Sequence, residues 1–281
     1  MPAPLRHPPH HPHHIRVAAA ILALAAAAAA AAPAPRFDPA LAAAVASSAR
    51  SGAFRARDAA RHPLAELSFF GIKPTMTVVE LWPGGGYWTE ILGPYLAAQG
   101  RYYVALPAPG DAEEDRGVAH WRARMAAQEQ RLGTIHETML GPGHYDIAPP
   151  DSADMVVTFR NLHNWMYGGY AEQALAACFK ALKPGGIFGI EEHRGRNDRT
   201  QDPRAKDGYV REDYAIALIK KAGFEYLGSS QINANPRDTK NWVNGVWTLP
   251  PTLSQGAKDR ARYLAVGEAD NFVLKFRKPR P

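Results

Sequence analysis

Residues 76–92 are the part of the chain that most constrains its fold, because a buried strand, a glycine turn and an amphipathic helix are expected there in succession. Val78, Val79 and Leu81 give the apolar run of a strand that is covered on both faces. The helix is indicated by apolar residues at helical spacing, namely Trp88, Ile91, Leu92, Tyr95 and Leu96. Glycines at 84–86 let a ligand approach the backbone at the carboxyl end of the sheet, where open α/β sheets bind nucleotides. We therefore expect a nucleotide-binding turn, with Glu80 as the charge at the end of its strand.

The glycine spacing distinguishes between two classes of nucleotide-binding protein. A dinucleotide fingerprint, G-x-G-x-x-G, requires a third glycine where this chain has Thr89, which disfavours binding of NAD. Residues 80–86, Glu-Leu-Trp-Pro-Gly-Gly-Gly, instead resemble motif I of the class I S-adenosylmethionine-dependent methyltransferases. Trp82 stands where that family usually has its first glycine. Taken alone, the turn is equally compatible with a tight turn in another α/β protein.

Two later stretches resemble the same family and follow in the expected order. Residues 181–191, Ala-Leu-Lys-Pro-Gly-Gly-Ile-Phe-Gly-Ile-Glu, are similar to its helix end and fifth strand, with Pro184 and Gly185 expected to stop the helix. Residues 150–159, Pro-Asp-Ser-Ala-Asp-Met-Val-Val-Thr-Phe, are similar to its fourth strand. Three matches in order favour the methyltransferase fold over an unrelated turn.

The remaining elements complete an α/β pattern. Further strands are expected at 101–106, 134–140, 224–232 and 272–276, and helical stripes lie between them. Alternating strands and helices with right-handed crossovers predict a Rossmann-like, seven-stranded, mostly parallel sheet with helices on both faces. The resemblance implies an antiparallel last strand near 270–275 and covers the chain from residue 63 onward.

Four short segments are similar to a narrower group, the predicted exported methyltransferases of bacteria. They are residues 61–63 (Arg-His-Pro), 69–74 (Phe-Phe-Gly-Ile-Lys-Pro), 80–86 and 159–165 (Phe-Arg-Asn-Leu-His-Asn-Trp). In that group Trp82 followed by proline is normal, so the missing glycine does not imply a broken site. The resemblance implies a fold and a cofactor class, but no substrate.

The N-terminus predicts a signal peptide over residues 1–32. Arg6 and Arg16 flank a His/Pro-rich leader, and residues 17–31 are an unbroken apolar run that is short and alanine-rich for a membrane span. A disordered leader or an early helix of the mature protein is the alternative. We expect a helical extension at 33–62, opened by Asp38 as an N-cap before Pro39, and a methyltransferase-like domain at 63–281. The protein is then exported, periplasmic or secreted, without a stable membrane anchor after signal removal.

Composition bounds the remaining function classes. The 281 residues are 46% hydrophobic, enough for one substantial α/β core. Cys178 is the single cysteine, so no intramolecular disulfide can form, and its apolar helical stripe indicates packing. The net charge of +6 is not accompanied by any nucleic-acid motif, so a small-molecule substrate is expected and nucleic acid is not. The oligomeric state is not predicted.

The resemblance implies a set of cofactor-binding residues around the turn. They are Glu80, Trp82, Gly84, Gly85, Gly86, Tyr87, Asp146 and Arg160. Glu80 is expected to contact the cofactor's amino group, with capping of the following turn as the alternative role. The family usually ends its second strand with an acidic residue that binds the ribose, whereas Leu106 and Pro107 stand there. Asp146 is the nearest carboxylate for the adenine side.

The catalytic candidates are polar residues that follow the fourth and fifth strands. Asn161, His163 and Asn164 follow the fourth, and His193 follows the fifth. His163 is suited to take a proton from an oxygen or nitrogen nucleophile, and an orienting or helix-capping histidine is the alternative. A zinc site that combines His163, His193 and Glu191 or Glu192 lacks diagnostic spacing, and no metal is expected.

These observations predict an S-adenosylmethionine-dependent methyltransferase that transfers a methyl group to a small molecule. An exported, catalytically inactive ligand-binding protein of the same fold is the alternative, favoured by Leu106 and disfavoured by Glu80, Gly84 and Gly86. A nicotinamide oxidoreductase is a third possibility, disfavoured by Thr89. Trp242 and Trp247, in the insertion before the last strand, are expected to cover the core.

Overall fold

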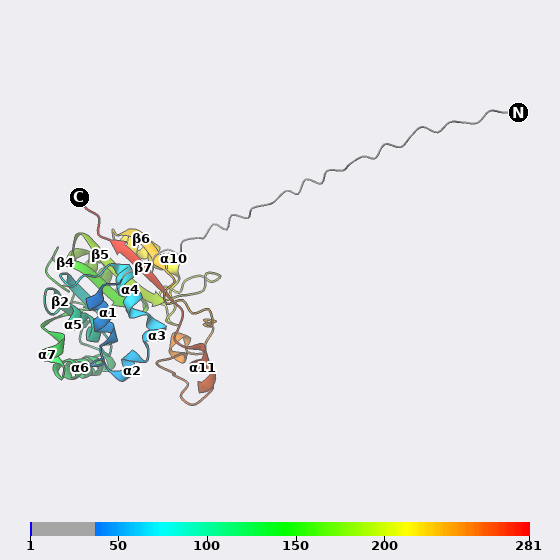
Figure 1. The fold of residues 1–281 in the computed structure, drawn as a ribbon, viewed down its shortest axis with the longest axis horizontal. Coiled ribbons are helices and arrows are strands. Elements are labelled where there is room, and N and C mark those ends of the chain that lie inside the picture. The colour runs from blue at the N-terminus through cyan, green and yellow to red at the C-terminus, as the bar shows by residue number, and fades with distance from the viewer. Residues whose placement is uncertain (2–36) are drawn as a thin grey trace. The chain divides into compact units, whose positions relative to one another are not determined.

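Seven strands form one sheet in the order β3-β2-β1-β4-β5-β7-β6, shown in a computed structural model that describes Met1 and residues 37–281 (Figure 1). The strands are β1 (Thr77–Leu81), β2 (Arg101–Pro107), β3 (Ile135–Leu140), β4 (Ala153–Phe159), β5 (Leu182–His193), β6 (Glu225–Ser230) and β7 (Asn271–Arg277). The neighbours from β3 to β5 pair in parallel, and β7 is antiparallel to both β5 and β6. The prediction of a seven-stranded, mostly parallel sheet is confirmed.

Helices cover both faces of this sheet. One face packs against α1 (Pro39–Ala46), α4 (Pro63–Phe70), α5 (Thr89–Leu96), α6 (Ala112–Ala126) and α7 (Glu129–Leu132). The other packs against α8 (Leu162–Gly168), α9 (Ala171–Ala181) and α10 (Glu212–Lys221). Val78 faces the first layer and Val79 the second, as the alternation of side chains along a strand requires. The apolar run of β1 is therefore buried on both sides, as expected for a strand in a sheet that has helices on both faces.

Two predicted boundaries differ from the structure. Helix α9 ends at Ala181, three residues before Pro184, so the expectation that Pro184 and Gly185 stop it is wrong. The helix ends early because Leu182 already pairs with Ala153, and the ladder then shifts register before Met155. The predicted N-cap is confirmed, since the Asp38 carboxylate accepts hydrogen bonds from the backbone N–H groups of residues 40 and 41 at the start of α1.

The segment between β6 and β7 holds a 3₁₀-helix, η1 (Gly245–Thr248), and α11 (Arg260–Val266), and it lies beside α2 (Gly52–Arg55) and α3 (Asp58–Arg61) (Figure 1). A small apolar cluster holds this segment together. Trp242 packs against that cluster, while Trp247 is 36% exposed. The expectation that both tryptophans cover the core is wrong for Trp247, which lines the cavity described below.

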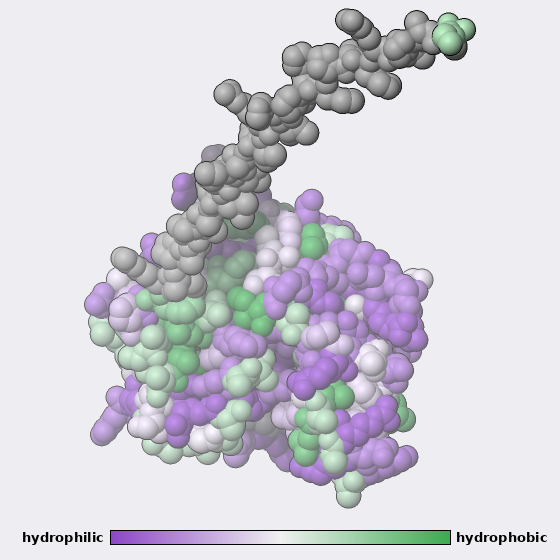
Figure 2. Space-filling model, turned by 45° about the vertical axis from the view of Figure 1, so that its right-hand side comes forward, coloured by the Kyte–Doolittle hydropathy of each residue, from purple (hydrophilic) through white to green (hydrophobic). Residues whose placement is uncertain are grey.

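Hydrophilic residues dominate the face shown in Figure 2, and hydrophobic residues are scattered among them. Within the described part of the chain, no helix combines the length and hydropathy that crossing a membrane requires. Residues 2–32 of the predicted signal peptide lie outside the described residues.

Candidate functional site

A cavity of about 360 Å³ opens at the carboxyl ends of β1, β4 and β5. It lies between β1 and β4, where the strand order reverses, and open α/β sheets bind ligands at such a switch point. Its volume falls in the range of small-molecule pockets. The cavity is lined by Phe54, Arg57, Arg61, Glu80, Trp82, Pro83, Gly84, Gly85, Tyr87, Trp88, Phe159, Arg160, Asn161, His163, Asn164, His193, Val246, Trp247, Pro250, Pro251, Thr252 and Ala269.

Glu80, at the end of β1, is fully buried and reaches the cavity wall. Its Oε2 accepts hydrogen bonds from the hydroxyl groups of Thr89, at 2.8 Å, and Tyr102. Its Oε1 has no partner among the described residues. Burial raises the pKa of Glu80 to about 7, although the hydrogen bonds from Tyr102 and Thr89 oppose the shift. Thr89, which takes the place of a fingerprint glycine, therefore holds this carboxylate.

Two of the three glycines in the turn, Gly84 and Gly85, line the cavity. Gly84 has φ +56°, and a Cβ placed on it would meet no atom within 4 Å. Gly85 also lines the cavity, with Phe54 as its neighbour. Gly86 faces the other way, since an added Cβ would lie 2.7 Å from Met125 Cε of α6. Gly86 therefore lets the turn pack against α6, and the contact of its backbone with a ligand stays a prediction.

Trp82 and Asn161 shape the bottom of the site. Trp82 has φ +48°, a strained conformation for a bulky residue, and its indole N–H donates to the Leu140 carbonyl at the end of β3, at 2.9 Å. The indole thus lies toward the ends of β2 and β3. The Asn161 side-chain amide donates to the Leu81 carbonyl at 3.1 Å and to Thr158 Oγ1 at 3.1 Å. Asn161 therefore ties the β4 end to the β1 end and acts as a positioning residue.

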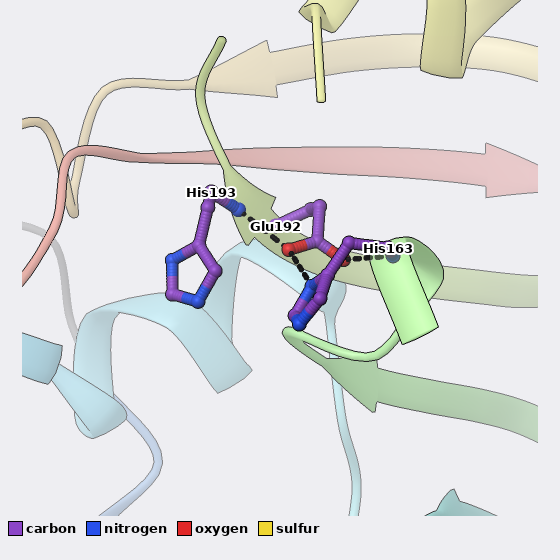
Figure 3. A group of neighbouring side chains, drawn as sticks. All are labelled: His163, Glu192 and His193. Carbon is purple, nitrogen blue, oxygen red and sulfur yellow. Dashed lines mark hydrogen bonds and ion pairs between the residues drawn. The ribbon is translucent and has the colours of Figure 1, made fainter. Parts of the chain in front are cut away.

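His163 and Glu192 form a buried pair (Figure 3). Nδ1 of His163, at the start of α8, lies 2.8 Å from Oε1 of Glu192 at the end of β5. The backbone N–H of His163 donates to Oε2, and that of His193 to Oε1. Burial raises the pKa of Glu192, but His163 and the hydrogen bonds outweigh it, so the net pKa is lowered. An ionised Glu192 keeps the proton on His163 Nδ1 and leaves Nε2 as an acceptor, which no residue of the described part of the chain engages.

His193 is oriented by Asn271. Asn271 Nδ2 donates to Glu191 Oε1 at 2.8 Å, which leaves its Oδ1 to accept from His193 Nδ1 at 2.7 Å. Burial lowers the pKa of His193 to about 3, and the attraction of Glu192 offsets only part of that effect. His193 is therefore a neutral imidazole whose Nε2 has no hydrogen-bond partner among the described residues, suited to hydrogen bonding and poorly suited to hold a proton.

His163, Glu192 and His193 are also a group that could hold a metal ion, since their ligand atoms lie within 4.8 Å of one another. The hydrogen bonds of Glu192 argue against a metal site. Glu192 is engaged by three N–H groups, so it orients His163 and leaves only two imidazole Nε2 atoms as ligands.

Three arginines that line the cavity converge on one carboxylate, that of Glu268. Glu268 Oε1 accepts from Arg57 Nε at 2.6 Å, and Oε2 accepts from Arg57 Nη2 at 2.9 Å, Arg160 Nη1 at 2.9 Å and Arg61 Nε at 3.3 Å. Arg160, at the end of β4, has the left-handed φ of +63°. The sequence pattern indicates neither Arg57 nor Glu268, because 211 positions separate them and no local spacing connects them.

The other predicted residues separate into two groups. Tyr87 and Asn164 line the cavity, and the Tyr87 hydroxyl donates to Asp58 at 2.6 Å. Asp146 is exposed and paired with Lys180 at 2.8 Å, outside the cavity lining, an arrangement that disfavours the predicted adenine contact.

The fold is shared with solved methyltransferase structures. An S-adenosylmethionine-dependent methyltransferase from Aquifex aeolicus superposes with a TM-score of 0.53 at 14% identity, over 79% of this chain and 93% of that one. Phosphoethanolamine N-methyltransferase 2 from Haemonchus contortus, in complex with phosphomonomethylethanolamine and S-adenosylhomocysteine, gives 0.54 at 15% identity, over 78% of this chain and 53% of that one. The cyclase SpnF gives 0.52 at 16%, over 82% of both chains.

Residues 37–281 therefore have the class I methyltransferase fold. A scan against models of protein families found no match, and neither did a search of curated proteins. Because one of the structural neighbours is named for a cyclisation, the fold does not specify the reaction, which must be argued from the site.

Proposed function

We propose that the protein is an S-adenosylmethionine-dependent methyltransferase that acts on a small molecule. The observation that carries the proposal is Glu80 Oε1, a buried, unpartnered carboxylate oxygen in the cavity wall beside a glycine turn with open space above Gly84. A buried carboxylate oxygen without a donor is costly, and a ligand ammonium group satisfies it. These residues fit the amino-acid end of the cofactor.

The adenosine end has an unusual surface. The indole of Trp82 extends toward the end of β3, and Leu106, at the end of β2, is buried and apolar. The aromatic face of Trp82 offers stacking to a base, and no carboxylate on β2 is available for ribose hydroxyls. Binding at this end would rest on apolar contact and on main-chain groups.

When bound, S-adenosylmethionine supplies an electrophilic methyl group on a good leaving group. The protein's tasks are to align the nucleophile, exclude water and remove a proton. His163 Nε2 accepts the nucleophile's proton, while Glu192 holds the ring through Nδ1 and stabilises the imidazolium. His193 Nε2 and Asn164 orient the acceptor from the same cavity.

An inactive ligand-binding protein of the same fold is the second candidate. Leu106 favours it, because the usual ribose contact is absent from the end of β2. Calorimetric titration with S-adenosylmethionine and S-adenosylhomocysteine, with NAD as the control, separates the alternatives. Binding of the first two alone supports the methyltransferase and justifies a screen of acceptors. Absence of binding would reject the methyl-transfer proposal and favour another ligand for this cavity.

We further propose that the chain is exported, on the basis of its N-terminal sequence and its similarity to predicted exported methyltransferases. Fractionation of cells that produce the tagged chain tests this. Recovery of a shortened protein outside the cytoplasm is expected, and a full-length cytoplasmic protein would contradict the proposal.

A further inference from the structure

The arginines of the cavity have more donors than the protein satisfies. Each guanidinium carries five N–H groups, yet the side-chain hydrogen bonds of Arg57, Arg61 and Arg160 to described residues all go to the single carboxylate of Glu268. The next carboxylate, Glu191, lies 3.9 Å from Arg160. One carboxylate shared by three guanidinium groups leaves positive charge and free donors facing the cavity.

Among the three arginines, Arg61 gives the clearest evidence of unused hydrogen-bond donors. Its side chain is only 3% exposed, and its two Nη atoms have no hydrogen-bond partner among the described residues. The guanidinium lies over the ring of Tyr87, with Cζ 4.4 Å from the ring centroid. Contact through the face of the guanidinium leaves its N–H edges available. Neither Nη atom is among the fully buried side-chain atoms that lack a partner, so both remain accessible to an anion in the cavity that Arg61 lines.

Charge around Arg160 supports the same conclusion. Burial raises the pKa of Glu191 to about 7, against the attraction of Arg160, so this carboxylate carries only part of a negative charge at neutral pH. Glu268 is therefore the main counter-ion of the three arginines. Its side chain is 10% exposed, and it belongs to the loop before β7, which makes it an internal substitute for a ligand carboxylate.

We propose that Arg57, Arg61 and Arg160 form an anion subsite that binds a carboxylate or phosphate group of the methyl acceptor in competition with Glu268. The assignment of this anion to the methyl acceptor rests on the proposed function. The binding of an anion by the arginines does not. Arg160 and His163 stand three residues apart after β4 and line the same cavity. The subsite thus holds the acceptor's anionic group while its nucleophile is presented to the candidate base. Planar guanidinium groups match the oxygens of both anions.

Titration of the protein with inorganic phosphate at constant ionic strength, balanced with chloride, tests the subsite. Tryptophan fluorescence reports binding, because Trp82, Trp88 and Trp247 line the cavity. Arg57→Gln should weaken phosphate binding by about tenfold, since it removes charge-assisted hydrogen bonds. Glu268→Gln should strengthen binding, since it removes the internal competitor. Arg122→Gln is the matched control, because Arg122 is half exposed and paired with Glu137 on the surface.

Opposite effects of Arg57→Gln and Glu268→Gln are not expected of residues that only hold the fold together. Equal affinity in both variants, or no saturable phosphate binding, would overturn the subsite. Repetition with saturating S-adenosylhomocysteine distinguishes the two sources of a carboxylate. Unchanged phosphate affinity supports an acceptor subsite, whereas displacement of phosphate would assign the arginines to the methyl donor's own carboxylate and overturn the acceptor assignment. A failure of S-adenosylhomocysteine to bind bears on the proposed function alone, because phosphate is first titrated without it.

Discussion

Replacing Glu80 with Gln should make the protein more stable at alkaline pH while it weakens the binding of cofactor. The glutamine has the shape of the glutamate, and its carbonyl oxygen can accept the hydrogen bonds that Thr89 and Tyr102 now donate to Oε2. Its amide NH₂ takes the place of Oε1, which has no partner among the described residues. The change therefore removes a buried charge and leaves the packing intact.

The size of the stabilisation follows from the pKa of Glu80, raised from the ordinary 4.5 to about 7 mainly by burial. Between these values the folded protein binds a proton that the unfolded chain has lost, so Glu80 lowers stability as pH rises from 4.5 to 7. The full difference is about 3 kcal/mol, because one pKa unit corresponds to about 1.4 kcal/mol. Glutamine does not titrate and removes this loss. Glu191, with a pKa of about 7, is present in both proteins and cancels in their difference.

Denaturant unfolding of both proteins at pH 5 and pH 8 measures the effect. The free energy of unfolding of Glu80→Gln minus that of the native protein should increase by up to about 3 kcal/mol between the two values. Glu172→Gln, which alters an exposed carboxylate, is the control and should show little change. A difference between Glu80→Gln and the native protein that is the same at both pH values would refute a raised pKa for Glu80. Calorimetry should also show that the native protein binds S-adenosylmethionine more tightly as pH rises through 7, and that the variant does not.

The other changes test separate parts of the site. Glu192→Gln should lower turnover on an identified acceptor by about a hundredfold, because His163 loses the neighbouring charge that stabilises its protonated form. Cofactor affinity should hardly change. Equal losses of turnover and of cofactor affinity would mean that His163 and Glu192 position the cofactor. Gly86→Ala should destabilise the protein by about 2 kcal/mol, mainly because its φ is +90°, and the flexible end of the Met125 side chain, 2.7 Å from the added Cβ, must also move to relieve a clash. Gly84→Ala meets no such clash and should instead reduce cofactor affinity, so a larger loss of stability than in Gly86→Ala would contradict the orientation of the turn. Asp146→Asn should leave cofactor affinity unchanged. Treatment with a chelator should change neither cofactor binding nor thermal stability, and a zinc-dependent rise in Tm would argue for a metal site.

The sheet and its glycine turn could be predicted because their signals are local. The apolar run of β1, the glycines after it and the helical stripe that follows lie within one short stretch of sequence, and each restricts the backbone independently. The early end of α9 was not predictable in the same way. It depends on the pairing of Leu182 with Ala153, a contact between segments that the sequence separates.

The candidate site was predictable only for residues at the end of a strand or shortly after it. Glu80 and His163 lie at the carboxyl edge because the ends of β1 and β4 meet there. Gly86 belonged to the same motif, but its orientation depends on the packing of α6, which the motif does not encode. Glu268 carries no local signal at all, since its role arises from contact with α3 and the end of β4.

Two adjacent residues show how the sheet gives identical carboxylates different tasks. Glu191 and Glu192 alternate across β5, so they point to opposite sides of the sheet. Glu192 receives three N–H donors around His163 and keeps its charge, as a lowered pKa indicates. Glu191 receives two neutral amide donors, and burial raises its pKa to about 7. The charge that a general base needs is thus in place before any ligand binds, while Arg160, 3.9 Å from Glu191, is only partly compensated by it. A small molecule with one anionic group and one nucleophile could therefore bind the arginines through the anion and present the nucleophile to His163.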